Sequence, residues 1–257
     1  MTGTGPRLEQ SARSPAPKQR RGSFWKELPV LLVVALGLAL LIKAFLVQAF
    51  CIPSPSMSNT LVKNDRVLVN KLVYEFRDVR RGEVIVFDAS NNLAKNGVEP
   101  GRIPSGDGVL VKARQFLGFG APGEKDYIKR VIGIPGDRVA CCDDQGRVTV
   151  QPEGGQPVPL EEGDYLFPGD VPSREPFCEQ GEDLRACPVG APGFLVPEGR
   201  YWVMGDHRSD SGDSRPTRET VPQDRIVGRA FVKIFPVGHV GGLGVPGTFD
   251  QPGLGGR

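Results

Sequence analysis

The sequence is poor in histidine, in net charge and in long hydrophobic runs. Its two histidines, His207 and His239, have no Cys or His partner at zinc-finger spacing, so we expect no structural zinc site. A formal net charge of +2 in 257 residues gives no bulk attraction to nucleic acid. The 34 glycines and 24 prolines indicate a loop-rich chain, but they fall short of the composition of wholesale disorder. The sequence has no internal repeat.

Cysteine is also scarce, with five residues at positions 51, 141, 142, 178 and 187. Disulfides are expected only if the body of the protein lies outside the cell. Cys178 and Cys187 fall in one short loop-like stretch and could bridge it, and a second pair could use Cys141 or Cys142. The alternative is that the thiols are free and buried. The sequence leaves the connectivity open.

One long hydrophobic run is present, over residues 28–50. It has 23 residues and a single charge, Lys43. At about 1.5 Å per residue it reaches roughly 34 Å, enough to cross a bilayer core of about 30 Å. The Pro-, Ser- and Arg-rich residues 1–26 predict a disordered basic arm, which places the N-terminus in the cytoplasm. We therefore expect a single transmembrane helix over residues 27–50, with the rest of the chain on the extracytoplasmic side.

Two other interpretations of this run compete with a membrane anchor. A buried helix of a soluble domain is disfavoured, because the length and the all-round apolarity of the run are excessive for one. A cleaved signal peptide is compatible with the small-x-small pattern of Val47, Gln48 and Ala49. The run is long for a signal peptide, however, and Lys43 interrupts it near its end, so we expect an uncleaved anchor.

Beyond residue 50 the sequence changes to short runs rich in Val, Ile and aromatic residues, separated by Gly, Pro and Asp. Such runs predict strands at residues 65–76, 82–88, 126–134, 137–142, 146–152, 200–206 and 228–235. The pattern favours a mainly β fold, an antiparallel sheet or barrel-like domain over residues 51–237. Within this domain, residues 109–119 are a candidate short helix and residues 151–198 a loop-rich insertion. The Gly-rich residues 238–257 are expected to form a flexible tail.

Two residues could supply a nucleophile and a base. Ser56 lies in a segment that Pro53 and Pro55 stiffen by fixing φ, which suits a side chain that must point one way. Lys129 lies in a predicted strand whose alternation puts it on one face with a tyrosine and a valine. Buried lysines are rare and lose their charge readily. With an ordinary pKa near 10.4, only about one lysine in 2,500 is neutral at pH 7, so burial would supply the free amine that a general base needs.

A third segment, residues 205–215, combines two arginines, three aspartates and three serines directly after the apolar run YWVM. Its opposite charges are dense enough to pair with one another. Such a loop could fold inward and bring a serine hydroxyl to the lysine. Taken alone, each of the three features fits an ordinary turn serine, strand lysine or solvated loop. Their combination predicts a catalytic site.

Four motifs follow the hydrophobic run in order: IPSPSMSNTL (52–61), DRVLVNKL (65–72), YIKRVIGIPGD (127–137) and GDHRSDSGDSR (205–215). Together they resemble the boxes of bacterial type I signal peptidases, the membrane-anchored serine proteases that remove signal peptides from exported proteins. Order and spacing match this family across residues 50–236. A lone PSxSM pattern is weak, but four boxes in order behind an anchor are specific.

The resemblance implies a role for each residue at a matching position. Ser56 would be the nucleophile, Lys129 the general base, and Ser211 a hydrogen-bond partner that orients the lysine amine. The Ser54 hydroxyl and the Ser56 N–H would form an oxyanion hole, in which each donor is typically worth about 3 kcal/mol. Asp206, Asp213 and Arg215 would hold the last motif in shape.

The resemblance also implies small apolar pockets that favour cleavage after Ala-x-Ala, because a larger side chain would clash. The implied substrate-binding residues are Phe50, Ile52, Pro53, Met57, Leu61, Val67, Asp126, Tyr127 and Ile128. Three other positions depart from the family's usual pattern. Pro55 replaces a common glycine and bears on the placement of Ser54, Asn64 replaces a frequent glycine, and His207 replaces a frequent asparagine. None of these changes removes a reacting group.

The implied protein is a membrane-bound endopeptidase with the bilayer and secretory preproteins as partners. We expect it in the cytoplasmic membrane, without a metal or other cofactor and without a nucleic-acid partner. Three alternatives remain. A self-cleaving repressor-type Ser/Lys protease would need a DNA-binding domain and no membrane span. A Ser-His-Asp hydrolase would use His207, and a membrane-anchored β domain would bind exported proteins without cleaving them.

Overall fold

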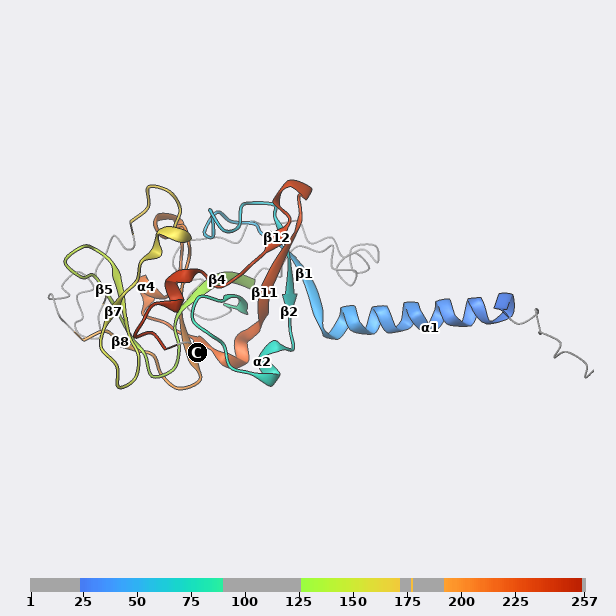
Figure 1. The fold of residues 1–257 in the computed structure, drawn as a ribbon, viewed down its shortest axis with the longest axis horizontal. Coiled ribbons are helices and arrows are strands. Elements are labelled where there is room, and N and C mark those ends of the chain that lie inside the picture. Colours follow the sequence, from blue (N-terminus) through green and yellow to red (C-terminus); the bar gives the residue numbers. More distant parts are fainter. Residues whose placement is uncertain (1–23, 90–125, 172–176, 178–191, 256–257) are drawn as a thin grey trace, which may run out of the picture. The chain divides into compact units, whose positions relative to one another are not determined.

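The computed structural model describes residues 24–89, 126–171, 177 and 192–255 (Figure 1). The chain divides into two compact units, residues 1–41 and 42–257, and each is described by itself. Several predictions lie outside the described residues: nearly all of the basic arm 1–26, the candidate helix 109–119, and the pair Cys178 and Cys187.

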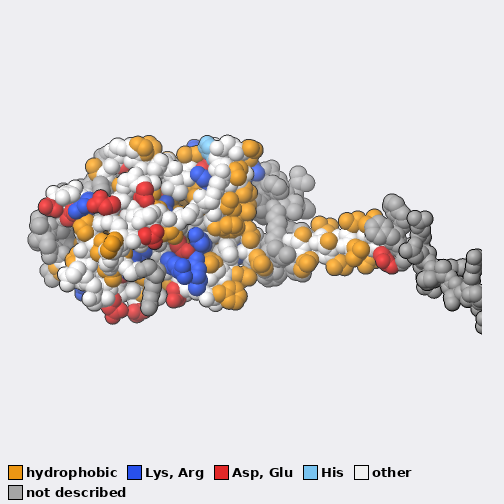
Figure 2. All heavy atoms as spheres, viewed as in Figure 1, with side chains coloured by type: hydrophobic (Ala, Val, Ile, Leu, Met, Phe, Trp, Pro, Cys, Tyr) orange, Lys and Arg blue, Asp and Glu red, His pale blue; other side chains and the backbone are white. Residues whose placement is uncertain are grey.

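Helix α1 spans Phe24–Phe45. Its described side chains are mostly apolar and exposed, with residues 30–33 between 58% and 71% exposed, and Figure 2 shows them along the helix in orange. Among the described residues, no helix combines the length and the apolarity that crossing a membrane requires.

The C-terminal boundary predicted for the hydrophobic helix, residue 50, is wrong. The helix ends at Phe45, and Val47–Cys51 form strand β1 instead. The reason is tertiary: β1 pairs along its length with strand β2, and Phe50 packs into the core with 4% of its surface exposed.

The strands form two antiparallel sheets, which confirms the predicted mainly β fold. In the described part of the chain the larger sheet has eight strands in the order β1-β2-β11-β3-β4-β9-β10, with β12 also paired to β11. Beyond β1, these strands are β2 (Arg66–Asn70), β3 (Val84–Asp88), β4 (Asp126–Gly133), β9 (Arg200–Met204), β10 (Val221–Pro222), β11 (Ile226–Phe235) and β12 (Gly241–Gly242). This order places β4 between β3 and β9, in the interior of the sheet.

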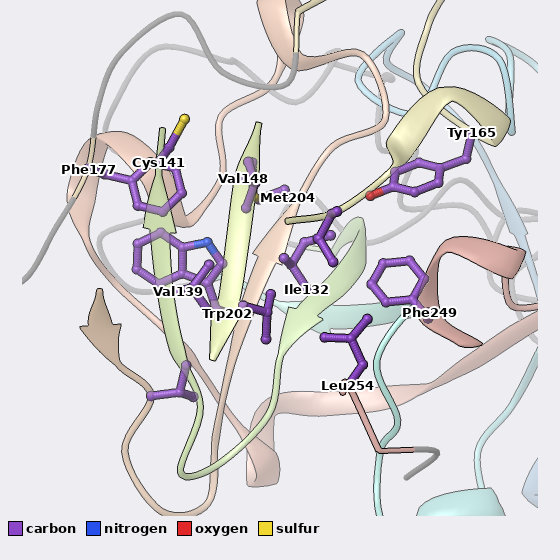
Figure 3. Close-up of a cluster of buried hydrophobic side chains, with 13 residues drawn as sticks. Ile132, Val139, Cys141, Val148, Tyr165, Phe177, Trp202, Met204, Phe249 and Leu254 are labelled. Atoms are coloured by element: carbon purple, nitrogen blue, oxygen red, sulfur yellow. The ribbon is translucent and has the colours of Figure 1, made fainter. Parts of the chain in front are cut away.

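The smaller sheet is built from the predicted insertion and the two strands before it. Its order is β7-β6-β5-β8, formed by β5 (Arg138–Cys141), β6 (Val148–Gln151), β7 (Val158–Pro159) and β8 (Phe194–Leu195). Its core contains Trp202 of β9, which stacks on Phe177 with ring centroids 5.1 Å apart (Figure 3). Part of the stretch predicted as loop-rich is therefore regular sheet.

Each predicted strand run contains an observed strand, but the run over residues 65–76 changes structure halfway. After β2 the chain forms helix α2 (Val73–Phe76). The Asn70 side-chain oxygen accepts hydrogen bonds from the N–H groups of Leu72 (3.0 Å) and Val73 (3.1 Å). Such local bonds from an asparagine turn the chain and compete with a continuing strand. The remaining short helices are α4 (Ser214–Thr217) and the 3₁₀ turns Glu162–Asp164, Arg208–Asp210, Gln223–Arg225, Val237–His239 and Gly247–Asp250.

The predicted flexible tail packs against the domain up to residue 255. Phe249 and Leu254 are 5% and 1% exposed and belong to the same hydrophobic cluster as Trp202 (Figure 3). Arg81 donates a hydrogen bond of 2.6 Å to the Leu254 carbonyl. The prediction of flexibility rested on glycine content, and it was wrong because the segment buries apolar side chains, Leu243 among them, and β12 pairs with β11.

We predict that Phe249→Ala destabilises the protein by about 3–5 kcal/mol, because truncating a buried phenylalanine leaves a cavity. Urea unfolding of the detergent-solubilised chain, followed by near-ultraviolet circular dichroism, measures this difference. Val237→Ala is the matched control, since Val237 is 84% exposed and should change stability by no more than about 0.5 kcal/mol. Equal, small effects of both changes would contradict the packed position of the tail.

Candidate active site

Ser56 lies in a tight turn that follows β1. The Ser58 N–H donates to the Pro55 carbonyl (2.8 Å), and the Leu61 N–H donates to the Met57 carbonyl (2.7 Å). Met57 and Leu61 are fully buried, so their side chains anchor the turn in the core. Ser56 itself is only 2% exposed. The Ser54 hydroxyl lies 3.2 Å from the Ser56 Oγ.

Lys129 reaches Ser56 from the interior of the larger sheet. Its Nζ lies 2.6 Å from the Ser56 Oγ and 3.1 Å from the Ile128 carbonyl oxygen, and the residue is 3% exposed. The structure thus brings together the predicted nucleophile and base, and Lys129 is buried as predicted. The alternation of the strand indicated one inward face, but both faces of β4 are covered, and the neighbouring Arg130 is also buried.

Burial lowers the pKa of Lys129 to about 8, because the ammonium loses its hydration. The carboxylates of Asp213 and Asp206 oppose this change, since a negative charge favours the ammonium, while the Arg215 guanidinium favours the neutral amine. About one amine in ten is therefore neutral at pH 7, compared with about one in 2,500 for an ordinary lysine.

Asp213 is the centre of the last motif. It accepts hydrogen bonds from the Arg215 guanidinium (2.8 Å to each oxygen), the Gly205 N–H (3.0 Å) and the Ser211 hydroxyl (2.8 Å). Burial alone would raise the pKa of this carboxyl, but Arg215 and the other donors hold it below its ordinary value. We predicted that Ser211 hydrogen-bonds the Lys129 amine. In the described part of the chain this bond is not formed, and the Ser211 hydroxyl donates to Asp213.

Gly205 lets the last motif, residues 205–215, come close to the turn that carries Ser56. We call this turn, residues 55–61, the nucleophile turn. A Cβ at this position would lie 2.2 Å from the Ser211 Oγ and 2.4 Å from the Ser56 carbonyl oxygen. Real side chains do not approach this closely, so any other residue would push the two serines apart. Two residues after Gly205, the backbone N–H of His207 donates a hydrogen bond of 3.1 Å to the Ser56 carbonyl.

Asp206 forms a second buried ion pair beneath the site. The Arg130 Nε and Nη2 donate to its two oxygens at 2.8 and 2.6 Å, and both side chains are at most 2% exposed. Thr60, in the nucleophile turn, donates to Asp206 and accepts from Arg130 (3.0 Å). Asp206 therefore connects the last motif both to β4 and to the nucleophile turn. Arg130 and Thr60 were missed, and only the position of Arg130 beside Lys129 in a buried strand could have indicated it.

A small cavity of about 30 Å³ adjoins Ser56 and Lys129. The predicted substrate-binding residues that line it are Pro53, Asp126, Tyr127 and Ile128; Ser54 and Gly212 complete its wall. The sequence analysis did not single out Gly212. A cavity needs about 10–15 Å³ of such space to hold one water molecule, so this one has room for about two or three, the scale of a small side chain.

The other predicted substrate-binding residues lie in the core rather than in the cavity wall. They are Phe50, Ile52, Met57, Leu61 and Val67, each at most 4% exposed. They pack in one hydrophobic cluster that also contains Ile128. The cluster therefore supports the apolar wall of the cavity from within.

The described cysteines form one disulfide and leave one free thiol. Within the described ranges no group of three or more His, Cys, Asp or Glu residues could hold a metal ion. Cys141 and Cys142 form a disulfide with each other, which adds a connectivity that the sequence left open, and Cys51 is free.

Comparison with known proteins identifies relatives over most of the chain. A family model described as signal peptidase, peptidase S26, matches residues 25–235. A probable signal peptidase I of Mycobacterium leprae is 32% identical, with 88% of this chain and 81% of the relative covered. A signal peptidase I of Mycobacterium tuberculosis is 33% identical (88% and 78% covered), and a probable signal peptidase I-2 of Synechocystis is 34% identical (91% and 82% covered).

The antiparallel fold and these matches define the protein as a serine peptidase, a hydrolase of peptide bonds. The chain belongs to the peptidase S26 family of signal peptidases, which confirms the resemblance found in the sequence.

We predict that Lys129→Met stabilises the protein by about 3 kcal/mol at pH 7. Because the pKa of Lys129 is lowered to about 8 from 10.5, the folded state binds this proton more weakly than the unfolded chain does. The folded state is therefore penalised fully below pH 8, and the penalty shrinks as the pH rises to 10.5. Unfolding free energies measured from pH 6 to 11 check the prediction.

The control is Lys63→Met, at an exposed position, which should not show this pH dependence. A difference between Lys129→Met and the unsubstituted protein that stayed constant over the whole pH range would refute the assignment of a depressed pKa.

Proposed function

We propose that the protein is a membrane-bound endopeptidase that removes N-terminal signal peptides from exported preproteins, using Ser56 and Lys129 as a catalytic dyad. The observation that carries this proposal is the 2.6 Å contact between the Lys129 Nζ and the Ser56 Oγ inside the protein. The relatives named above are signal peptidases, which supports the choice of substrate. Secretory preproteins are therefore the expected partners.

In the acylation step the neutral Lys129 amine takes the proton of the Ser56 hydroxyl, and the Ser56 Oγ attacks the carbonyl carbon at the cleavage site. A tetrahedral intermediate with a negatively charged oxygen results. Its collapse breaks the peptide bond, and the Lys129 ammonium donates its proton to the departing amine of the mature protein. The signal peptide is left as an ester on Ser56.

In the deacylation step Lys129, neutral again, takes a proton from a water molecule. The resulting hydroxide attacks the ester carbonyl, and the Ser56 oxygen leaves and recovers a proton from the Lys129 ammonium. The signal peptide departs with a new carboxyl group, which releases its proton to the solvent. All the earlier proton transfers run through the same amine, so the chemistry requires no metal or other cofactor.

The oxyanion hole of this mechanism consists of the Ser54 hydroxyl and the Ser56 N–H. The Ser54 Oγ lies 3.2 Å from the Ser56 Oγ. From there its hydroxyl can donate a hydrogen bond to the carbonyl oxygen that becomes negatively charged when Ser56 attacks. Pro53 and Pro55 flank Ser54 and restrict its backbone, which supports a fixed position for this donor.

Selectivity for Ala-x-Ala would follow from the small cavity beside the dyad. A volume of about 30 Å³ accepts a methyl group, and larger side chains would clash with the wall formed by Tyr127 and Ile128. We assign Ile52, Met57 and Leu61 to the support of this pocket. Phe50, Val67 and Asp126 are assigned to the pocket for the residue two positions earlier.

We further propose that the apolar run that ends with α1 at Phe45 contains the membrane anchor, and that the catalytic domain, from β1 to the packed tail and including the insertion 151–198, lies on the extracytoplasmic side. The support is the single-charge apolar run and the basic residues that precede it. Anchoring would hold Ser56 close to the lipid headgroups, at the depth where the cleavage site of a membrane-inserted signal peptide emerges.

The hydrolase alternative based on His207 is disfavoured by the position of that side chain. The His207 ring stacks on Phe167, with centroids 4.2 Å apart, and among the described contacts His207 reaches Ser56 only through its backbone N–H. The Ser56 side chain instead contacts Lys129 and Ser54.

We predict that Ser56→Ala and Lys129→Ala each abolish cleavage of a preprotein with an Ala-x-Ala site, because each removes a reacting group. His207→Ala should retain cleavage. The assay uses the full chain in lipid vesicles, with N-terminal sequencing of the product to locate the cut. Cleavage by Ser56→Ala, or loss of cleavage only with His207→Ala, would exclude the dyad, and an unsubstituted protein that binds but never cuts would favour the binding-domain alternative.

The pH dependence of cleavage gives a separate prediction. Since only the neutral amine can accept the serine proton and the pKa of Lys129 is lowered to about 8, kcat/KM should fall as the pH drops below 8, by about tenfold per pH unit. Stopped-time cleavage assays from pH 5 to 10 measure the profile. A flat profile from pH 9 to about 5 would rule out a lysine base.

A further inference from the structure

A segment of the insertion lies against both halves of the active site. We call residues 162–170 the docking segment; it follows β7 and begins with the 3₁₀ turn Glu162–Asp164. Its Phe167 N–H donates to the Asp206 carbonyl at 2.9 Å, and the carboxylate of Asp170 accepts from the Ser209 N–H at 3.1 Å. The sequence analysis assigned no role to this segment.

The docking segment also holds the nucleophile turn. The Asn59 side-chain amide donates to the carbonyls of Tyr165 (3.2 Å) and Leu166 (2.9 Å). Asn59 has a φ of 84°, in the left-handed region that asparagine tolerates better than most residues. Asn59 lies three residues after Ser56, so these bonds fix the turn that carries the nucleophile.

Glu162 forms the most deeply buried contact of the segment. Its carboxylate accepts hydrogen bonds from both terminal nitrogens of Arg208, one of them at 3.0 Å, and both side chains are completely buried. The Tyr165 hydroxyl also donates to Glu162 and accepts from Arg208 (3.3 Å). The face of the Tyr165 ring carries the Arg130 guanidinium, 4.6 Å from the ring centroid.

Arg208 passes this constraint to the residues around Asp213. Its Nε donates to the Gly205 carbonyl at 3.0 Å, and its own carbonyl accepts from Arg215 at 2.7 Å. Gly205 and Arg215 both donate to Asp213. The position of Asp213 therefore depends on Arg208, and the position of Arg208 depends on Glu162.

The charged groups with the largest effects on the pKa of the Lys129 amine are Asp213, Asp206, Arg215 and Asp210, in decreasing order. All belong to the last motif, and the ring of Tyr127, on the strand of Lys129 itself, lies 5.8 Å from its Nζ. Among the groups that favour the ammonium, Asp213 has the largest effect. A displacement of Asp213 would therefore let Lys129 lose its proton at lower pH.

We propose that Glu162 is a positioning residue for peptide-bond cleavage, which acts through Arg208 to hold the last motif in register with Ser56 and Lys129. This inference rests on the proposed function. It assigns a role to the docking segment, which supplies the carboxylate that pairs with Arg208 of the last motif. A substitution far from the reacting groups that shifts them by about 1 Å can slow a reaction by about 100-fold.

The test compares Glu162→Gln and the double change Glu162→Gln/Arg208→Met with the unsubstituted full chain in vesicles, on the same preprotein. The double change leaves no unpaired buried charge, so it folds without the penalty of the single change. For both variants we expect kcat to fall by about 10- to 100-fold with KM nearly unchanged, and the acidic midpoint of the pH profile to move to lower pH. Simple loss of folded protein would lower the rate equally at every pH.

Glu161→Gln is the matched control, since Glu161 is the neighbouring carboxylate, 65% exposed, and its side chain pairs with Arg147 at the surface. Its kcat and pH profile should equal those of the unsubstituted protein. A folded double variant with unaltered kcat and midpoint would overturn the inference. Ser56→Ala assayed alongside separates the two proposals: if it cleaves, the dyad fails, whereas an inactive Ser56→Ala beside fully active Glu162 variants contradicts the role of Glu162 alone.

Discussion

The Lys129 amine lies inside the protein, 2.6 Å from Ser56, where its charged form has lost the hydration it would have in water. The amine can act as a base only while that loss outweighs the attraction of nearby carboxylates. Its pKa of about 8 shows that burial prevails. Much of the surrounding structure places carboxylates near this amine while limiting how far they raise its pKa.

The two carboxylates that raise the pKa of Lys129 most each form an ion pair with an arginine. Asp213 pairs with Arg215 and Asp206 pairs with Arg130, both at 2.8 Å or less. Each pair presents a dipole instead of a full charge, so the field at the amine is reduced while the hydrogen-bond acceptors remain in place. This explains why the last motif is so rich in opposite charges. Its charges form a structural network rather than a solvated surface, because its central residues are buried.

The sequence predicted what depends on local pattern and missed what depends on distant contacts. Strand positions followed from the alternation of Val, Ile and turn residues, and Ser56 and Lys129 followed from short motifs. The Glu162–Arg208 pair joins residues 46 positions apart and the Arg130–Asp206 pair joins residues 76 apart, and no periodicity links them. The packed tail and β1 were misjudged for the same reason: burial against another segment decided their structure.

The aim of Ser56 is likewise a tertiary property. The prolines beside it restrict φ, but a restricted backbone can still point a hydroxyl in several directions. In the structure its turn is tied to separate parts of the chain: His207 donates to the Ser56 carbonyl, Asn59 to the docking segment, and Lys233 of β11 to the Thr60 carbonyl at 3.1 Å. Since each tie comes from a different element, the turn can rotate only if several elements move together. The folded domain, more than the stiffness of the motif, therefore keeps the hydroxyl directed at the amine.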